Sequence, residues 1–492
     1  MTLNPSQASA LQSRIRHAYF WTIVGNTSRY AATLGISLLL ARMLKPEDYG
    51  LIGMIIVFTE LLGSVLDSCV GPAVVHFDER NAEQERSTYF TASLILGVLF
   101  TIFLFVGAPL VAHFYREPRL VPLLRVMSVL LIVGSVKTVS GGILTRELRF
   151  RELSFSDIFA SLAGGFVAIV MAYRGFGVWS LVANQFLFIL LTSLAYAWWV
   201  RPQFRLPLNR EITVRLWRYA APLTGSSLLF KFYDNADYLV VGRVLGSEAL
   251  GFYSVAFRLA MLINERISSV INRVAFPSFA SLKDEPPRVI GHWFAVTKRV
   301  TLLTFPILVW LGFNAEDFIR VALGSRWLPA ALPLQFLCVM TAIKILTNIV
   351  GQVLIAVGYP AVSFRYDLLN AIALPASFLI GCKMGGLLGV GIAWCTVFPL
   401  LRFFFFLGAR RKLHFSLRAY ARNLFDPIVV SVACGLLMAP AEWVFQNGWV
   451  RLCVRSLLWS AGVLLCAAVS RNVRNLIANT FTIFSSAKLS QS

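Results

Sequence analysis

The feature that most constrains the fold is a succession of about fourteen apolar segments separated by short polar stretches. A helix needs about 20 apolar residues to cross a hydrocarbon core that is about 30 Å thick. The mean hydropathy of +0.70 and the charged fraction of 14% agree with this assignment, because soluble domains carry about 25% charged residues. The sequence therefore predicts an all-α polytopic membrane protein with about 14 transmembrane helices. The expected spans lie near 20–41, 50–76, 88–112, 121–143, 153–173, 177–199, 219–241, 250–275, 293–313, 329–357, 361–381, 386–408, 424–441 and 452–470.

An internal repeat divides these spans into two groups. The first copy, residues 40–53, reads LARMLKPEDYGLIG, and the second copy lies within residues 238–254, which read YLVVGRVLGSEALGFYS. Membrane transporters are often built from two such repeats with the substrate path between them. Any two helix–loop–helix joints share some features, but about six spans follow each copy, which favours a true repeat. Four positions are identical at a constant offset of 201 residues: Arg42 with Arg243, Leu44 with Leu245, Glu47 with Glu248 and Gly50 with Gly251.

The repeat predicts two pseudo-symmetric six-helix lobes followed by two further C-terminal helices. The expected N-lobe covers residues 1–200, with spans 1–6, and a basic cytoplasmic linker covers 201–218. The expected C-lobe covers 219–408, with spans 7–12, and residues 409–492 hold a second basic linker, accessory spans 13 and 14 and the tail. Both basic linkers fall on the side of the membrane where the N-terminus lies. The excess of Lys and Arg on that side predicts that both termini are cytoplasmic.

The short loops, the cysteines and histidines, and the distribution of charge disfavour several classes of function. No loop is long enough for a soluble catalytic domain, so the sequence does not predict an enzyme. The seven cysteines lie in or beside apolar spans without a C-x-x-C pair, and the five histidines are scattered. We therefore expect no metal site and no bound cofactor. The formal net charge of +21 does not indicate a nucleic-acid partner, because most of the positive charges lie at span ends.

Charged residues inside the spans are the candidate functional residues. Each costs at least about 2.5–3.5 kcal/mol at membrane depth and should face protein or water. Arginine and lysine suit phosphate groups, so the cations predict a cavity that binds an anionic headgroup. The acidic residues are candidates for coupling to H⁺ or Na⁺. The candidate substrate-binding cations are Arg29, Arg125, Lys137, Lys231, Arg258, Arg266 and Lys344, and the candidate coupling carboxylates are Glu60, Asp67, Asp234 and Asp237.

Structural roles for the same residues stay open. Lys231 and Asp234 are three residues apart on one helical stripe, so they can pair and lock helices together. Cations near span ends, such as Arg273, can extend to the headgroups instead. Because the first and seventh spans are equivalent in the repeat, we expect Arg29 and Lys231 to face each other across one cavity.

Three stretches resemble the polysaccharide-transporter branch of the multidrug/oligosaccharidyl-lipid/polysaccharide (MOP) superfamily, in particular Wzx-type flippases similar to colanic-acid exporters. The resemblance covers about residues 10–480. It implies a MATE/MOP-like fold in the bacterial cytoplasmic (inner) membrane. Lipid II flippases resemble this architecture too. The stretches are LLLARMLKPEDYGLIGM (38–54), GILTRELRFRELSFSDI (142–158) and DNADYLVVGRVLGSEALGFYSVAFRL (234–259).

The resemblance also implies a function. Wzx-type flippases move an undecaprenyl-pyrophosphate-linked oligosaccharide from the cytoplasmic to the periplasmic leaflet by alternating access, for the synthesis of O-antigen, capsule or exopolysaccharide. The implied partners are this lipid-linked oligosaccharide, membrane lipid and other polysaccharide-assembly proteins. The implied cationic cavity agrees with the candidate residues Arg29, Lys231 and Arg258.

Two other functions stay open. A cation-coupled small-molecule exporter has the same fold, although an exporter of organic cations would favour an acidic cavity. A membrane enzyme acting on lipid-linked glycans usually carries a large extracytoplasmic loop or an acidic motif in the first loop. The first loop here is only LKPEDYG, in which Glu47 and Asp48 are better explained as helix-start residues.

Overall fold

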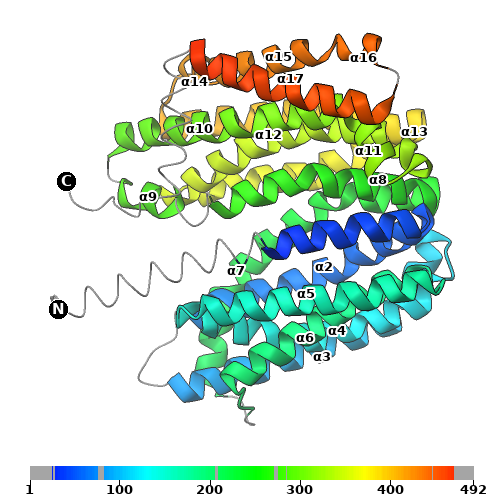
Figure 1. Cartoon of the computed structure of the whole chain (residues 1–492). Helices are drawn as coiled ribbons and strands as arrows, with labels where there is room; N and C mark the ends of the chain where they lie inside the picture. The colour runs from blue at the N-terminus through cyan, green and yellow to red at the C-terminus, as the bar shows by residue number, and fades with distance from the viewer. Residues whose placement is uncertain are drawn as a thin grey trace. The chain divides into compact units, whose positions relative to one another are not determined.

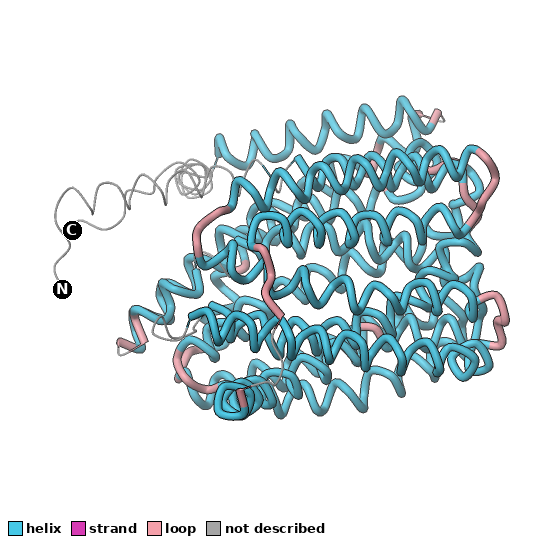
Figure 2. The backbone as a smooth tube through the Cα atoms, turned by 90° about the horizontal axis from the view of Figure 1, so that it is seen from below, coloured by secondary structure: helices cyan, strands magenta, loops and turns pink. Residues whose placement is uncertain are grey.

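The structure is a computed structural model that describes residues 25, 28–75, 82–204, 209–270, 275–283, 285–445 and 447–469. These residues form helices joined by short loops, without a strand in any of the described ranges (Figures 1 and 2). Residues 28–43 are helical. The first helices that follow are α2 (Pro46–Val75), α3 (Ala82–Tyr115), α4 (Leu120–Arg146), α5 (Phe150–Tyr173), α6 (Val178–Val200), α7 (Arg210–Asp234) and α8 (Ala236–Val270). The later helices are α9 (Phe276–Ser281), α10 (Pro286–Phe313), α11 (Ala315–Ala322), the 3₁₀ helix η3 (Ser325–Ala330), α12 (Ala331–Ala356), α13 (Pro360–Leu413), α14 (Leu417–Asn423), α15 (Phe425–Met438), α16 (Ala441–Val444) and α17 (Gly448–Val469).

The predicted all-α membrane architecture is confirmed. Within the described part of the chain, 11 helical segments are long and apolar enough to cross a membrane. Two of them, at 42 and 54 residues, are long enough to cross twice. Each contains a kink, at Gly246 (φ 87°) in α8 and at Gly385–Gly386 in α13. The predicted total of 14 spans stays a prediction.

Helix starts follow ordinary capping chemistry. The Asn209 side chain accepts hydrogen bonds from the backbone N–H groups of Glu211 (3.0 Å) and Ile212 (3.2 Å), which begins α7. At the start of α2, the Asp48 carboxylate accepts from the backbone N–H of Lys45 at 3.0 Å. Asp48 therefore acts as a helix-start residue, as the sequence predicts.

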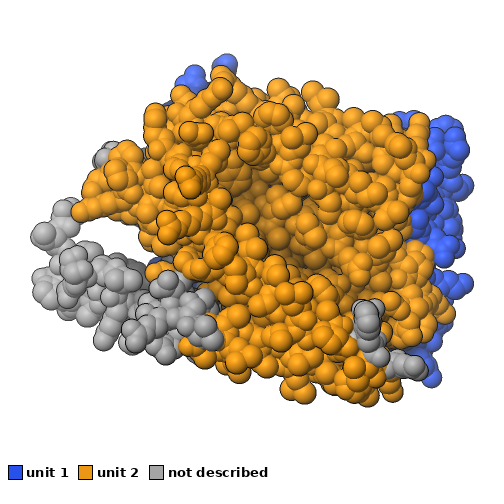
Figure 3. Space-filling view, turned by 90° about the horizontal axis from the view of Figure 1, so that it is seen from above, with its two compact units in different colours: residues 1–251 blue, residues 252–492 orange. Residues whose placement is uncertain are grey.

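The chain divides into two compact units, Met1–Gly251 and Phe252–Ser492, which Figure 3 distinguishes by colour. In unit 1, α3 packs on α4, α5 packs on α6, and α2 packs on both α4 and α7. In unit 2, α12 packs on α13, and α10 packs on α12 and α15, while α17 covers α15 and α11. The predicted lobes, with their boundary at 201–218, stay a prediction.

The two repeat copies meet in a reciprocal backbone contact within unit 1. A Cβ atom on Gly50 would lie 1.7 Å from the carbonyl oxygen of Ser247, and one on Gly251 would lie 1.8 Å from that of Pro46. Pro46 and Ser247 are separated by 201 residues, like Gly50 and Gly251. Gly50 of the first copy therefore packs on Ser247 of the second, and Gly251 of the second packs on Pro46 of the first. The two contacts are equivalent, as expected of a true repeat.

The loop between α3 and α4 ties the two copies together. Arg119 donates to Glu117 (Nε to Oε1, 2.7 Å) and also reaches Glu47 of the first copy (Nη1 to Oε2, 3.4 Å). Glu117 also hydrogen-bonds the side chain of Ser247 in the second copy. The hydrogen bond from Arg119 lowers the pKa of Glu117, so this carboxylate stays charged at neutral pH.

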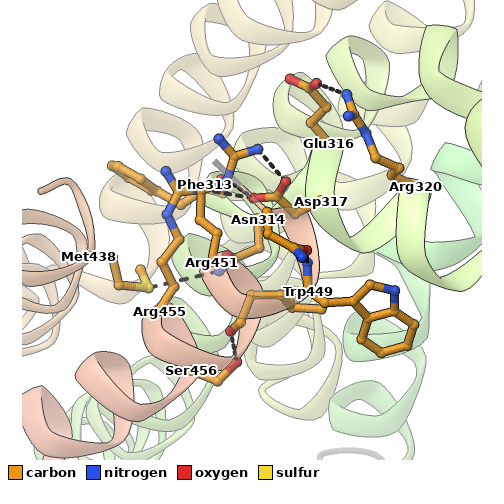
Figure 4. A network of polar contacts seen from close by, with 12 residues as sticks. Phe313, Asn314, Glu316, Asp317, Arg320, Met438, Trp449, Arg451, Arg455 and Ser456 are labelled. Carbon is orange, nitrogen blue, oxygen red and sulfur yellow. Dashed lines mark hydrogen bonds and ion pairs between the residues drawn. The ribbon is translucent and has the colours of Figure 1, made fainter. Parts of the chain in front are cut away.

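In unit 2, α17 docks through a buried ion group on α11 (Figure 4). The Asp317 carboxylate is 1% exposed. Both the Nε and the Nη2 of Arg451 donate to it, and Arg455 Nη1 lies 3.4 Å from its Oδ2. Arg455 also donates to the backbone carbonyl of Phe313 at 3.1 Å. This group therefore helps to fix the position of α17, which also packs on α15 and donates a hydrogen bond from Trp459 to the backbone of α10.

We expect Asp317→Asn to lower the free energy of unfolding of the purified protein by about 3–5 kcal/mol, because it removes the buried negative charge that Arg451 and Arg455 share. Glu316→Gln is the matched control, since Glu316 pairs with Arg320 at 2.7 Å on an exposed face, and such pairs contribute about 0–1 kcal/mol. Thermal unfolding in detergent measures both. Equal shifts in the two variants would contradict the docking role.

Gly50→Ala and Gly251→Ala should each lower the free energy of unfolding by about 3 kcal/mol or more, because the new methyl group would overlap a backbone carbonyl. Gly63→Ala, also in α2, has no atom within 4 Å of the added Cβ and should change stability by about 1 kcal/mol at most. The yield of monodisperse protein and its unfolding midpoint test this expectation. Well-folded Gly50→Ala protein with an unchanged midpoint would be inconsistent with the contact.

Candidate functional site

Helix 28–43 packs against α5 in parallel, and this packing positions the first candidate cation. The contacts recur at sequence separations of 128 or 129 residues, so the two helices advance together. Small residues allow the close approach, since a Cβ on Gly165 would lie 2.2 Å from the side chain of Ile36. The paired positions are Gly25 with Ser154, Arg29 with Asp157, Thr33 with Ser161, and Ile36 with Gly165.

Arg29 lies beside Asp157, a carboxylate on α5. The distance from Arg29 Nε to Asp157 Oδ2 is 3.9 Å, and the two side chains are 25% and 23% exposed. The guanidinium also lies 4.6 Å from the centre of the Tyr30 ring. Tyr196 on α6 donates a hydrogen bond of 2.8 Å to the other oxygen of Asp157. Asp157 is therefore held from two sides.

Lys137 on α4 connects this pair to the next one. It lies within electrostatic reach of Asp157, Asp67 and Arg29, and its Nζ is 5.0 Å from the centre of the Phe188 ring. Asp67 on α2 accepts a hydrogen bond of 2.7 Å from Thr138, the residue after Lys137. Lys137 therefore lies between two carboxylates from different helices.

Lys231 on α7 pairs with Glu60 on α2. Its Nζ donates to Glu60 Oε2 at 2.8 Å, and the two side chains are 34% and 44% exposed. Asp234 and Asp67 also lie within electrostatic reach of Lys231. The short contact is thus to a different helix, rather than to Asp234 on the same stripe.

Together these residues form a group that we call the charged chain: Arg29, Asp157, Lys137, Asp67, Lys231 and Glu60. All of them lie on helices of membrane-spanning length or on helix 28–43. Partly exposed charges at membrane depth must face water or protein rather than lipid. The charged chain is therefore the candidate site in unit 1 for a charged ligand. Its cations are balanced by carboxylates.

Two other candidates in unit 1 lie outside the charged chain. Arg125 is exposed near the start of α4, with its guanidinium 5.0 Å from the ring of Phe105 on α3. Asp237 is fully buried, and its Oδ1 accepts the backbone N–H of Tyr238 at 2.8 Å.

The unit 2 candidates lie on α8 and α12. Arg258 is exposed on α8, whereas Lys344 on α12 is buried, with Nζ 5.8 Å from the ring of Phe257 and 3.9 Å from Sδ of Met261. A turn further along, Asn348 on α12 donates to Asn264 on α8 at 3.1 Å. The side chain of Arg266 lies outside the described residues.

Two charged residues were absent from the predicted set. Asp157 could have been found, because it is a carboxylate inside an expected span, in the same way as Asp67. Arg402 on α13 is 7% exposed, and its guanidinium lies between the rings of Tyr366 (4.7 Å) and Phe398 (4.3 Å). The contact with Phe398 joins two residues four apart on one helix, which the sequence does signal. The contact with Tyr366 depends on how the two halves of α13 pack, and the sequence carries no local sign of it.

Metal coordination has no obvious place in the part of the chain that the structure describes. Among those residues, no group of three or more His, Cys, Asp or Glu side chains could hold a metal ion.

The fold and the charged chain together define a multi-pass helical membrane protein that carries paired charges inside its spans. The sequence profile described as "Polysaccharide biosynthesis protein" matches residues 39–332, and the chain belongs to this family. The family resemblance expected from the sequence motifs is thereby confirmed.

Characterised relatives align over most of this chain. The teichuronic acid biosynthesis protein TuaB of Bacillus subtilis (strain 168) is 28% identical over 384 residues, which are 76% of this chain and 77% of the relative. The lipopolysaccharide biosynthesis protein WzxC of Escherichia coli (strain K12) is 24% identical and covers 81% of this chain and 83% of itself. The succinoglycan biosynthesis transport protein ExoT of Rhizobium meliloti (strain 1021) is 27% identical, with 77% and 76% coverage.

Solved structures share the fold. The lipid II flippase MurJ in an inward closed conformation has a TM-score of 0.72 at 12% identity, covering 93% of this chain and 99% of that protein. An inward-facing multidrug resistance MATE family transporter of the MOP superfamily has a TM-score of 0.62 at 17% identity, with 80% and 96% coverage. At these identities the likeness establishes the architecture alone.

The Lys231–Glu60 pair gives a test of the charged chain. Lys231→Met should lower the free energy of unfolding, because it leaves Glu60 without its cation, and the double variant with Glu60→Gln should recover part of the loss. We expect a coupling of about 1 kcal/mol, within the range measured for polar pairs in membrane proteins. The coupling is measured by unfolding the parent, the two single variants and the double variant in lipid nanodiscs. Strictly additive effects would show that the two side chains act independently.

Proposed function

We propose that the chain is a flippase that moves a lipid-linked oligosaccharide across the bacterial cytoplasmic (inner) membrane during surface-polysaccharide synthesis. The observation that carries the proposal is a chain of partly exposed charges on membrane-length helices in a member of the polysaccharide biosynthesis family. The names of the relatives, which include a succinoglycan transport protein, support the same function. The protein would act as a transporter and not as an enzyme.

The proposed substrate headgroup is undecaprenyl pyrophosphate carrying the oligosaccharide. Arg29, Lys231 and Arg258 would bind its phosphates, since guanidinium and ammonium groups both suit phosphate oxygens. The sugar would cross through a hydrated region while the polyprenyl tail stays in lipid. Both termini would lie in the cytoplasm, because the basic linkers 201–218 and 409–422 would then face the cytoplasm.

Transport would proceed by alternating access, with H⁺ or Na⁺ as the candidate coupling ion. Glu60, Asp67 and Asp234 are the candidate coupling groups, because they lie near Lys231. Protonation or ion binding at any of them would change the charge that Lys231 experiences. Asp237 is a weaker candidate, since it is fully buried and bonded to its own helix start.

One observation favours a second function. The cations of the charged chain are balanced by carboxylates, and a balanced site also suits a cation-coupled small-molecule exporter. Solved exporters with this fold are multidrug transporters. Drug efflux is therefore the alternative to be measured alongside glycan transport.

Complementation distinguishes the two functions. We expect the chain to restore surface polysaccharide in a bacterium that lacks its own flippase for a matching glycan. Arg29→Ala, Lys231→Ala and Arg258→Ala should each reduce restoration at least about tenfold, since each loses a charge-assisted contact to phosphate. Arg288→Ala is the matched control, because this exposed arginine pairs with Glu285 and is not among the candidate substrate-binding cations.

Expression of every variant is matched by immunoblotting of membrane fractions. Equal restoration by the parent and the three alanine variants would support the flippase function and contradict the proposed phosphate contacts. Drug efflux without restoration in any of several glycan backgrounds would instead favour the exporter.

A further inference from the structure

We propose that Asp157 is an internal counter-ion that holds Arg29 when no substrate is bound and is exchanged for a substrate phosphate when one binds. Asp157 is then a positioning residue that controls how readily Arg29 is released to the ligand. The inference rests on the proposed function, because the incoming group is a phosphate or pyrophosphate carried by a lipid.

The contact between the two residues is loose. Arg29 Nε and Asp157 Oδ2 are 3.9 Å apart, beyond the 2.7–2.9 Å of a charge-assisted hydrogen bond. The Nε atom is buried and has no hydrogen-bond partner in the described structure. Asp157 therefore supplies charge to Arg29 while leaving a donor unused. A phosphate, which offers several oxygens to the guanidinium fork, would use it.

Asp157 also has other partners that would stabilise its charge after Arg29 moves away. Its Oδ1 accepts a hydrogen bond of 2.8 Å from Tyr196, and Lys137 lies within electrostatic reach. When Arg29 turns away, the carboxylate keeps one hydrogen bond and one nearby positive charge. This compensation matters, because a carboxylate left alone at membrane depth costs several kcal/mol.

The exchange requires little motion. Helix 28–43 and α5 are fixed to each other one turn away, where Thr33 and Ser161 share a hydrogen bond of 3.1 Å, and again at the Ile36–Gly165 contact. Both charged side chains are about a quarter exposed, so the guanidinium can reach water by rotating its own side chain. Arg29 keeps an anionic partner before and after the exchange.

The inference predicts opposite effects on phosphate binding for two substitutions that introduce uncharged side chains of similar shape. Asp157→Asn keeps the shape and an oxygen for Tyr196 but removes the competing charge, so phosphate binding should tighten about three- to fivefold, which corresponds to about 1 kcal/mol. Tyr196→Phe removes the support of Asp157 and leaves it more dependent on Arg29, so binding should weaken by a similar factor. A general loss of folding would weaken binding in both variants.

The experiment measures binding of undecaprenyl pyrophosphate, and separately of inorganic pyrophosphate, to the full chain in lipid nanodiscs. The proteins are the parent, Asp157→Asn, Tyr196→Phe, Arg29→Ala and the double variant Asp157→Asn/Arg29→Ala. The tightening should be present with Arg29 and absent without it. Tightening for both ligands supports exchange with any pyrophosphate, and tightening for the lipid alone supports exchange with a headgroup in the membrane.

The exchange would be overturned if Asp157→Asn bound the ligands as the parent does or more weakly. The proposed function would stay intact in that case, provided that Arg29→Ala still weakened binding. If the parent bound neither ligand, the proposed function itself would fail. Thermal unfolding of each variant verifies folding. If Asp157→Asn does not fold, the sign of the Tyr196→Phe effect still decides, and tighter binding by that variant would overturn the inference.

Discussion

A charge at membrane depth must be paired, hydrated or stacked on an aromatic ring, and this constraint explains most of the polar contacts in the protein. In the charged chain of unit 1, cations and carboxylates from five helices lie near one another and remain partly exposed. At the end of unit 2, one buried carboxylate holds two arginines. In α13, Arg402 is stacked between two aromatic rings. The first of these arrangements is the most exposed of the three, which is why it is the candidate for transport.

Burial separates the charges with a structural role from the candidate functional ones. Asp317 is nearly inaccessible, and Arg455 also donates to a backbone carbonyl, so the group stabilises the docking of α17. Lys231 and Glu60 are accessible, and their pairing can be broken by a ligand or a proton without exposing an apolar core. The same residue types thus serve two purposes in one chain, and exposure determines which purpose each serves.

Much of the fold was predictable because the signals are local. Apolar length predicted the helices, and four identical positions predicted the repeat, whereas the contacts of Gly50 and Gly251 with the opposite copy came from the structure. The site was less predictable, because its pairs come from helices far apart in sequence. Lys231 and Asp234 share a helical stripe, yet the short contact is to Glu60 because α2 packs on α7. Likewise, the partner of Arg29 depends on the parallel packing of helix 28–43 against α5, which no local pattern in the sequence encodes.

The reciprocal glycine contact has the form of an isologous interface, in which the same surface serves both partners. In a symmetric dimer of two identical half-length chains, one codon would supply both glycines, and a single mutation would disturb the crossing twice. In the present chain the two positions are encoded separately, and each glycine is constrained by the backbone of the other copy. The remaining positions are free of this double constraint, and most of them differ between the copies. The crossing therefore preserves a two-fold geometry that the surrounding sequence no longer displays.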